Sequence, residues 1–141
     1  MTNVRNLKSG YWRPWLKREQ RCLVQATSFC EWTDSRPKVT HWFALSDERP
    51  LFWFAGLWRP WTGELKGESG EHRLFAFLTT QANAVVAPIH AKAMLVFLTT
   101  PEDCETWLGG PAEAALALQQ PAPDDLLRIV ATGAKSDPTA V

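Results

Sequence analysis

Glu31 is the residue of this sequence best placed for acid–base chemistry. It lies near the end of residues 21–32, in which two apolar runs separated by small polar residues predict two strands joined by a tight bend. A carboxylate on such a half-buried strand is either paired or functional, because acidic side chains are rarely buried alone. Burial beside the indole of Trp32 would raise the pKa of Glu31 and suit it to proton transfer near neutral pH. The alternative is a strand-edge glutamate that points into water.

His90 is a second candidate for proton transfer. It follows a strand predicted over residues 74–79 and a short helix predicted over residues 81–86, which Pro88 ends. A histidine in such a loop either exchanges protons or is an ordinary structural or solvent-facing group. The other histidines lie in separate segments and the three cysteines lack a C-x-x-C spacing. We therefore expect no metal site, no cofactor and no disulfide framework.

The first 21 residues are basic and rich in aromatic side chains. They carry six Lys and Arg residues and one Glu, a net charge of +5, although the whole chain is neutral. Cations interleaved with aromatic rings suit single-stranded nucleic acid, because phosphates need neutralising while unstacked bases need a flat face. The alternative is a solvated basic segment whose indoles pack into the core.

The rest of the pattern predicts an α+β fold with an antiparallel sheet and short helices mainly in the C-terminal half. We expect strands over residues 39–45, 51–58, 94–98 and 128–131, helices over 101–108 and 111–119, a helical turn at 124–127, and a polar surface loop over 62–72. The length fits one domain, residues 1–141. With no apolar run long enough for a bilayer and no signal-peptide layout, we expect a cytoplasmic protein without membrane contact.

Several motifs in a fixed order resemble one known family. They are N-V-R from residue 3, RCLVQATSFCEW from residue 21, AGLW from residue 55, and a series made of Leu78, Thr79, Thr80, Ala82, Asn83, Ile89 and His90. Together they are similar to the SOS-response-associated peptidase (SRAP) family, whose pattern runs approximately N-x-R, RCLVPADGFYEW, AGLW, TT-x-AN and IH-x-RMP. The resemblance spans the chain and implies a partly open, barrel-like sheet.

The resemblance implies a sensor of DNA damage that recognises abasic sites in single-stranded DNA. Family members cap such sites through a covalent link to an N-terminal cysteine and are regarded as thiol peptidases of the SOS response. By resemblance, Glu31 and His90 would move protons at the sugar aldehyde. Asn3 would orient the nucleophile, and Arg5 would bind a backbone phosphate. We expect Glu31 to lie at the floor of a cleft with His90 and Asn3 close by. The further DNA contacts that we expect are Trp12, Arg13, Trp15 and Lys92.

The sequence departs from the family pattern at the nucleophile. The family's cysteine directly follows the initiator methionine in a Met-Cys-Gly-Arg start, which these 141 residues lack. We therefore expect an SRAP-like domain that is incomplete at its N-terminus, with the missing segment possible elsewhere. Cys30 replaces a tyrosine and Gln25 a proline of the pattern. Lys92, in place of the arginine after the histidine, keeps the charge but not the planar fork that grips phosphate.

Three functions fit these features. The first is recognition of abasic single-stranded DNA without an adduct stable to denaturation. If Met1 is removed, the free amine of Thr2 could form at most a labile imine in place of the cysteine. The second is a non-catalytic, prophage-type remnant that binds single-stranded DNA. The third is a hydrolase, which no catalytic-elbow or helix-start context supports, using Cys22, Cys30 or Cys104 with the histidine.

Overall fold

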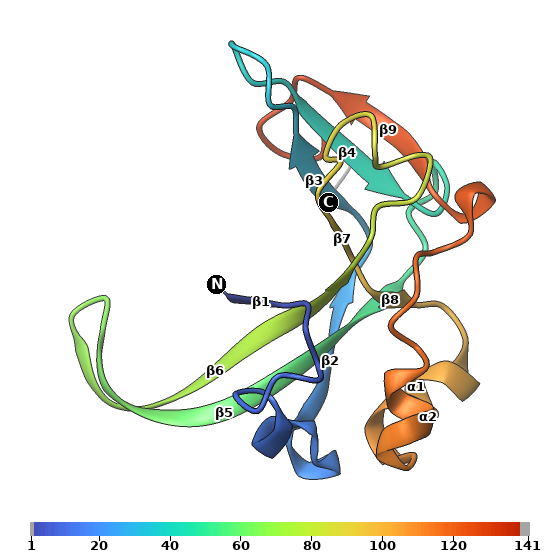
Figure 1. Cartoon of the computed structure of the whole chain (residues 1–141). Coiled ribbons are helices and arrows are strands. Elements are labelled where there is room, and N and C mark those ends of the chain that lie inside the picture. The colour runs from blue at the N-terminus through green and yellow to red at the C-terminus, as the bar shows by residue number, and fades with distance from the viewer. Residues whose placement is uncertain (1, 139–141) are drawn as a thin grey trace.

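The computed structural model describes residues 2–138, and its architecture is mostly β (Figure 1). The strands are β1 (Thr2–Val4), β2 (Arg21–Ala26), β3 (Phe29–Trp32), β4 (Thr40–Ala44), β5 (Phe52–Leu65), β6 (Glu68–Thr80), β7 (Met94–Leu95), β8 (Phe97–Leu98) and β9 (Arg128–Thr132). The helices are α1 (Pro101–Gly109) and α2 (Ala112–Leu116), and the 3-10 turns are η1 (Arg13–Leu16), η2 (Arg18–Gln20) and η3 (Asp124–Leu126). Short helices therefore do gather in the C-terminal half, as predicted.

The main sheet curls into a half-barrel. Its order is β1-β6-β5-β2, antiparallel except where β1 joins β6 in parallel. Beyond the last pair of their ladder, Gly56 with Phe77, β5 and β6 no longer pair with each other. There β7 pairs with β6 and β8 pairs with β5, so the β7–β8 segment lies between the two strands. A second antiparallel sheet, β3-β4-β9, lies across the upper end in Figure 1. The predicted α+β fold with a partly open, barrel-like sheet is confirmed.

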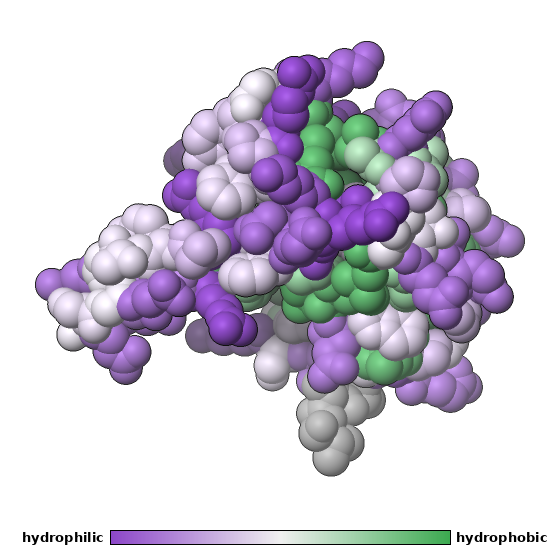
Figure 2. Space-filling model, turned by 90° about the horizontal axis from the view of Figure 1, so that it is seen from below, coloured by the Kyte–Doolittle hydropathy of each residue, from purple (hydrophilic) through white to green (hydrophobic). Residues whose placement is uncertain are grey.

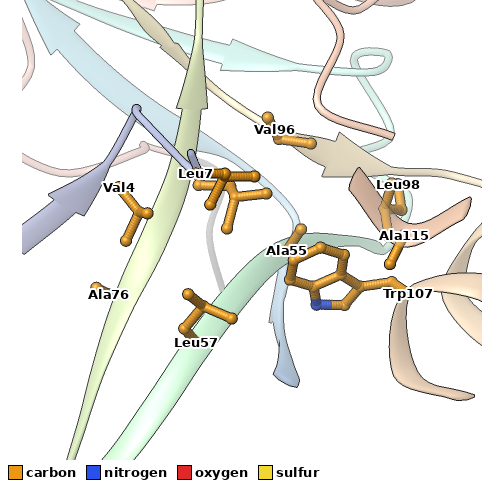
Figure 3. Packing of buried hydrophobic residues seen from close by; sticks show 10 residues of the cluster. Val4, Leu7, Ala55, Leu57, Ala76, Val96, Leu98, Trp107 and Ala115 are labelled. Atoms are coloured by element: carbon orange, nitrogen blue, oxygen red, sulfur yellow. The ribbon is translucent and has the colours of Figure 1, made fainter. Parts of the chain in front are cut away.

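Two apolar clusters lie on opposite faces of the main sheet. Along β5, Ala55 and Leu57 face one cluster, and Phe52 and Phe54 alternate with them and face the other, as the two-residue period of a strand requires. The lower cluster, on the side of α1 and α2, consists of Val4, Leu7, Ala55, Leu57, Ala76, Leu78, Val96, Leu98, Trp107 and Ala115 (Figure 3). The upper cluster, shared with the second sheet, consists of Phe29, Phe43, Phe52, Phe54, Phe77, Val86, Met94, Phe97 and Leu127.

Arg21 and Trp107 tie the start of β2 to the end of α1. The indole of Trp107 is fully buried, and its Nε1 donates to the carbonyl of Cys22 at 2.9 Å. Arg21 is 6% exposed, and its guanidinium donates to the carbonyls of Trp107 (2.7 Å), Gly110 (3.0 Å) and Leu16 (3.1 Å). These bonds satisfy the charge and fix the register of the strand that leads to β3.

The predicted surface loop over residues 62–72 is wrong, because β5 and β6 run through it as a long hairpin that projects from the body (Figures 1 and 2). Only Lys66 and Gly67 form the turn, with φ of 52° and 84°. Two residues with positive φ match the type I′ turn that suits a twisted hairpin. Cross-strand contacts such as that of Trp61 with His72, whose ring centroids lie 5.8 Å apart, stabilise the polar and glycine-rich stretch.

The short helix predicted over residues 81–86 is also wrong, because turns over residues 84–89 take its place. The buried Asn83 competes with a helix, since its Oδ1 accepts from the backbone N–H of Val86 at 3.0 Å. The backbone N–H of His90 then donates to the carbonyl of Val86 at 2.8 Å. These bonds set the loop that carries His90.

The remaining predicted elements are present with adjusted bounds. Thr100 caps α1 as expected, since its Oγ1 accepts from the N–H of Asp103 at 3.2 Å. The strand predicted over residues 94–98 is interrupted at Val96, whose N–H and carbonyl bond to β6 and β5 respectively. The second helix is shorter than predicted and ends at Leu116.

Candidate functional site

Strand β3 places Glu31 at the edge of the upper cluster. Phe29 is 8% exposed and packs among the phenylalanines of this cluster. Side chains alternate along a strand, so Glu31 lies on the same face as Phe29, whereas Cys30 and Trp32 lie on the other. The side chain of Glu31 is 22% exposed. It is therefore screened from most of the solvent and still within reach of a ligand.

The loop after β6 brings His90 to Glu31. Nδ1 of His90 lies 4.0 Å from Oε2 of Glu31, and 2.8 Å from the carbonyl of Ala93. A carbonyl can only accept, so Nδ1 carries the hydrogen and the neutral ring keeps Nε2 as its acceptor. Ile89, which precedes the histidine, packs against the upper cluster and holds the loop down. The structure thus brings together two candidate residues that are far apart in sequence.

Burial raises the pKa of Glu31, and the neighbouring His90 partly opposes this shift. Desolvation disfavours the carboxylate, while a nearby positive charge favours it. A carboxyl group poised in this way exchanges its proton closer to neutral pH than a solvated glutamate does. The pair can therefore both accept and deliver protons at a bound ligand.

Asn3 lies on β1 with its side chain exposed, and is paired with Phe77 of β6. Residues opposite one another in a ladder point to the same face, so Asn3 shares the face of Phe77 and of the upper cluster. Its neighbour Val4 is fully buried on the opposite face. Asn3 therefore lies on the side of the main sheet that the Glu31–His90 pair borders.

Arg5 and Lys92 are both exposed, one after β1 and the other two residues beyond the histidine. The backbone near Arg5 is held by Gln119, whose Nε2 donates to the carbonyls of Arg5 (2.7 Å) and Thr79 (2.9 Å). Sequence reasoning missed this role of Gln119, because nothing in the sequence signals a glutamine that bridges the ends of β1 and β6. The bridge fixes where β1 ends and the arginine begins.

Trp12 and Trp15 lie on the opposite face of the sheet. Both are half-buried and pack against the lower cluster, and the guanidinium of Arg59 lies 5.6 Å from the ring centroid of Trp15. With the 61% exposed Tyr11 they line a pocket of about 90 Å³. The indoles thus serve the core in part, as the alternative interpretation of the basic segment supposed, while keeping an accessible edge.

A larger, basic groove of about 730 Å³ lies beside this pocket. Its lining combines apolar and basic side chains, namely Leu7, Lys8, Arg13, Leu16, Lys17, Arg18, Glu19, Arg21, Pro111, Ala112 and Leu116. Figure 2, seen from below, shows hydrophobic surface exposed between hydrophilic residues on this side. Glu31 and His90 line neither pocket. The predicted basic contacts therefore divide between the two faces, with Arg13 on the lower one.

The cysteines have no features of a nucleophile. All three are free and partly buried, and burial raises the pKa of each thiol, with Glu31 adding to the shift at Cys30. Cys22 packs against Gly56, where an added Cβ would lie 3.1 Å from its Sγ. A raised pKa keeps a thiol protonated and unreactive. The hydrolase hypothesis therefore finds no support among these thiols.

Within residues 2–138, no group of three or more His, Cys, Asp or Glu side chains is arranged to hold a metal ion. None of the helices in the same stretch has the length and hydropathy needed to cross a membrane.

These features define a mostly β half-barrel domain with a partly buried glutamate–histidine pair at the edge of its aromatic cluster. The family model described as SOS response associated peptidase (SRAP) matches residues 2–135. The chain belongs to the SRAP family. No curated protein matches the sequence.

Solved structures of the same fold include two bacterial proteins studied by structural genomics. A protein from Bacteroides thetaiotaomicron matches with a TM-score of 0.72 and 27% identity, over 89% of this chain and 56% of its own. A protein from Bordetella bronchiseptica matches with a TM-score of 0.73 and 21% identity, over 95% of this chain and 64% of its own. The chain thus spans less than two thirds of the length of either structure.

Proposed function

We propose that this chain recognises abasic sites in single-stranded DNA through the Glu31–His90 pair. The observation that carries the proposal is the 4.0 Å approach of His90 Nδ1 to Glu31 Oε2 in a chain of the SRAP family. Two titratable groups held together at a partly exposed edge are better suited to a reactive sugar than to an intact, unreactive backbone.

The chemistry of an abasic sugar matches what this pair can do. The sugar exists as a cyclic hemiacetal in equilibrium with a ring-opened aldehyde. Opening removes a proton from the C1′ hydroxyl and delivers one to the ring oxygen. Nε2 of His90, the acceptor of the neutral ring, is a base for the first step, and Glu31, whose pKa is raised by burial, is in its protonated form an acid for the second.

Asn3 and Arg5 would complete the site on the same side of the sheet. The exposed Asn3 amide can both donate to and accept from sugar oxygens. The Arg5 guanidinium, exposed just beyond β1, can bind the adjoining phosphate in a bidentate manner. Lys92 offers a second cation beside the histidine loop. DNA would then be gripped by its backbone and identified by the missing base.

We propose recognition without a stable covalent link. The three thiols of the chain have raised pKa values, and the cysteines of β2 and β3 lie in strands, so none is poised to attack an aldehyde. An N-terminal amine could condense with the aldehyde to an imine, releasing one water, but without a thiol the product would hydrolyse readily.

The test compares two oligonucleotides that differ only in an abasic site or a thymidine at one position. By fluorescence anisotropy we expect tighter binding of the abasic strand. Glu31→Gln and His90→Gln should each remove this preference and leave the affinity for the thymidine strand unchanged. His72→Gln, a histidine change on the hairpin, is the matched control. Equal affinity of the unaltered protein for the two strands would refute the proposal.

A denaturing gel tests the absence of a stable link. We expect no shifted band after incubation with the abasic strand alone, and at most weak trapping with borohydride, which reduces an imine to an amine. A band stable to denaturation without reductant would show that this chain forms the covalent product by itself.

The alternative is a non-catalytic module that binds single-stranded DNA. The observation in its favour is the basic groove on the lower face, which holds Lys8, Arg13, Lys17 and Arg18 away from the Glu31–His90 pair. In that case affinity should fall steeply with salt and respond to Arg13→Ala, because phosphate contacts release counterions. The affinity for single-stranded DNA should not change in Glu31→Gln.

A further inference from the structure

One phenylalanine stands apart from the others. Six of the chain's seven phenylalanines form the upper cluster, whereas Phe75 on β6 is 43% exposed. Its ring centroid lies 5.5 Å from that of Phe77 in an edge-to-face contact. Because side chains on one face of a strand recur every two residues, Phe75 continues the aromatic face of the upper cluster out along the hairpin.

Trp58 and Arg73 extend this face. Trp58 on β5 pairs directly with Phe75, so the two rings share one side of the hairpin. The guanidinium of Arg73, two residues further along β6, lies 5.6 Å from the ring centroid of Trp58. A cation held over one face of an indole leaves its charge available to a phosphate, and the exposed ring of Phe75 remains open to a planar group. We call Trp58, Arg73 and Phe75 the hairpin strip.

The strip begins beside the candidate site and has a defined outer end. Phe77 pairs with Gly56 on one side and with Asn3 on the other, so the strip is continuous with the strand that carries Asn3. Further out on the same face, by alternation from Trp58 and Arg73, lie Glu64 and Glu71. Their carboxylates would repel an anionic strand, so the strip accommodates only a few nucleotides.

From these contacts we propose that the hairpin strip binds the unpaired nucleotides that adjoin the abasic site, with a base stacked on Phe75 and Trp58 and a phosphate on Arg73. The choice of DNA as the occupant rests on the function proposed above. Charge favours it over an apolar protein partner, which would cover the phenylalanine but leave the exposed arginine without a counterion. Interleaved rings and cations are what unstacked single strands require.

The experiment compares Phe75→Ala with Leu65→Ala. Leu65 is 41% exposed on the same hairpin but on the opposite face, so it controls for loss of exposed apolar surface. Binding is measured with oligothymidine and with a strand of the same length whose sugars carry no bases. We expect Phe75→Ala to weaken binding of oligothymidine by about 5- to 150-fold and to leave the base-free strand unaffected. Phe75→Trp should restore the affinity, and Leu65→Ala should change nothing.

The outcomes separate this inference from the proposed function. Equal loss with both strands, or no loss with either, overturns the strip as a stacking surface, even if abasic sites are still preferred over thymidine. A loss confined to oligothymidine supports the strip, even if the unaltered protein does not distinguish an abasic site. If the unaltered protein binds neither strand, both proposals fail.

Discussion

Arg21 is the first residue of β2 and Glu31 is the last but one of β3, yet the two charged side chains differ in burial and in hydrogen bonding. Arg21 is 6% exposed, and its guanidinium makes three hydrogen bonds to backbone carbonyls in the lower half of the molecule. Glu31 is 22% exposed at its side chain, and within the described part of the chain its ionic neighbour is His90 at 4.0 Å. Each guanidinium nitrogen of Arg21 donates to a backbone carbonyl, whereas the carboxylate of Glu31 has one long contact, with His90, among the described residues.

The difference indicates which of the two charges is structural. A buried guanidinium whose three nitrogens all donate to backbone carbonyls contributes mainly to the fold. A half-buried charge with a single long contact is costly for the fold, because desolvation is not fully repaid. Such a cost is typical of residues kept for binding or catalysis. Three substitutions test this distinction, from the largest expected effect to the smallest.

Arg21→Met should destabilise the fold by about 3 kcal/mol or more, because three carbonyls lose their donor and the bond to the carbonyl of Trp107 is buried. Urea unfolding measures the change. Arg18→Met is the control, since Arg18 is exposed and its Nε makes only a long hydrogen bond of 3.4 Å to the carbonyl of Gly110. We expect less than about 0.5 kcal/mol there. Similar losses for the two variants would contradict a structural role specific to Arg21.

Trp107→Phe should cost about 1–3 kcal/mol by urea unfolding, since the carbonyl of Cys22 loses the Nε1 donor at 2.9 Å while most of the ring is kept. Trp61→Phe, on the projecting hairpin, should cost less, because the indole of Trp61 is only half-buried. If Trp107→Phe were neutral, the lower face would not depend on complete hydrogen bonding, and the comparison with Glu31 would lose its basis.

Glu31→Gln should change the free energy of unfolding least of the three, and should raise it rather than lower it. Burial raises the pKa of Glu31 above its unfolded value, so the folded state holds the proton more tightly. The free energy of unfolding therefore falls as the pH rises from the pKa of Glu31 in the unfolded state to its pKa in the folded state. Below both pKa values the carboxyl group is protonated in either state, and its burial as a charge costs nothing. The variant should be slightly more stable than the unaltered protein at neutral pH.

The pH dependence makes this prediction specific. The stability advantage of Glu31→Gln should vanish as the pH falls below the ordinary glutamate pKa of about 4.3. Glu64→Gln, a change on the exposed tip of the hairpin, should show no comparable trend. A destabilised Glu31→Gln protein at neutral pH would mean that the carboxylate is fully paired, like Arg21.

Local patterns predicted the β2–β3 segment, the capped helix α1 and the last strand, because apolar runs, a cap at Thr100 and an initial proline act over a few residues. They failed over residues 62–72, where cross-strand pairs rather than composition stabilise the hairpin. They failed again at Asn83, whose side chain replaces helical hydrogen bonds. In both places contacts between distant residues decide the conformation.

The candidate site was predictable only in part. The unusual position of Glu31 was visible in its own segment, but its approach to His90 joins a strand and a loop far apart in the sequence and followed from the family resemblance alone. Gln119 and the hairpin strip carried no sequence signal, since one is a common polar residue and the other is a face of a hairpin that the pattern did not reveal.

The parallel pairing of β1 has a consequence for motion. This edge strand is joined to β6 over three residue pairs, and the amide of Gln119 holds its far end. So few bonds make β1 a unit that can open locally, at the cost of exposing the buried Val4. Each opening would withdraw Asn3 from the upper face while Glu31 and His90 stay in place. Amide hydrogen exchange in β1 would therefore report how often the site is assembled, and a ligand that needs Asn3 would slow that exchange in proportion to its affinity.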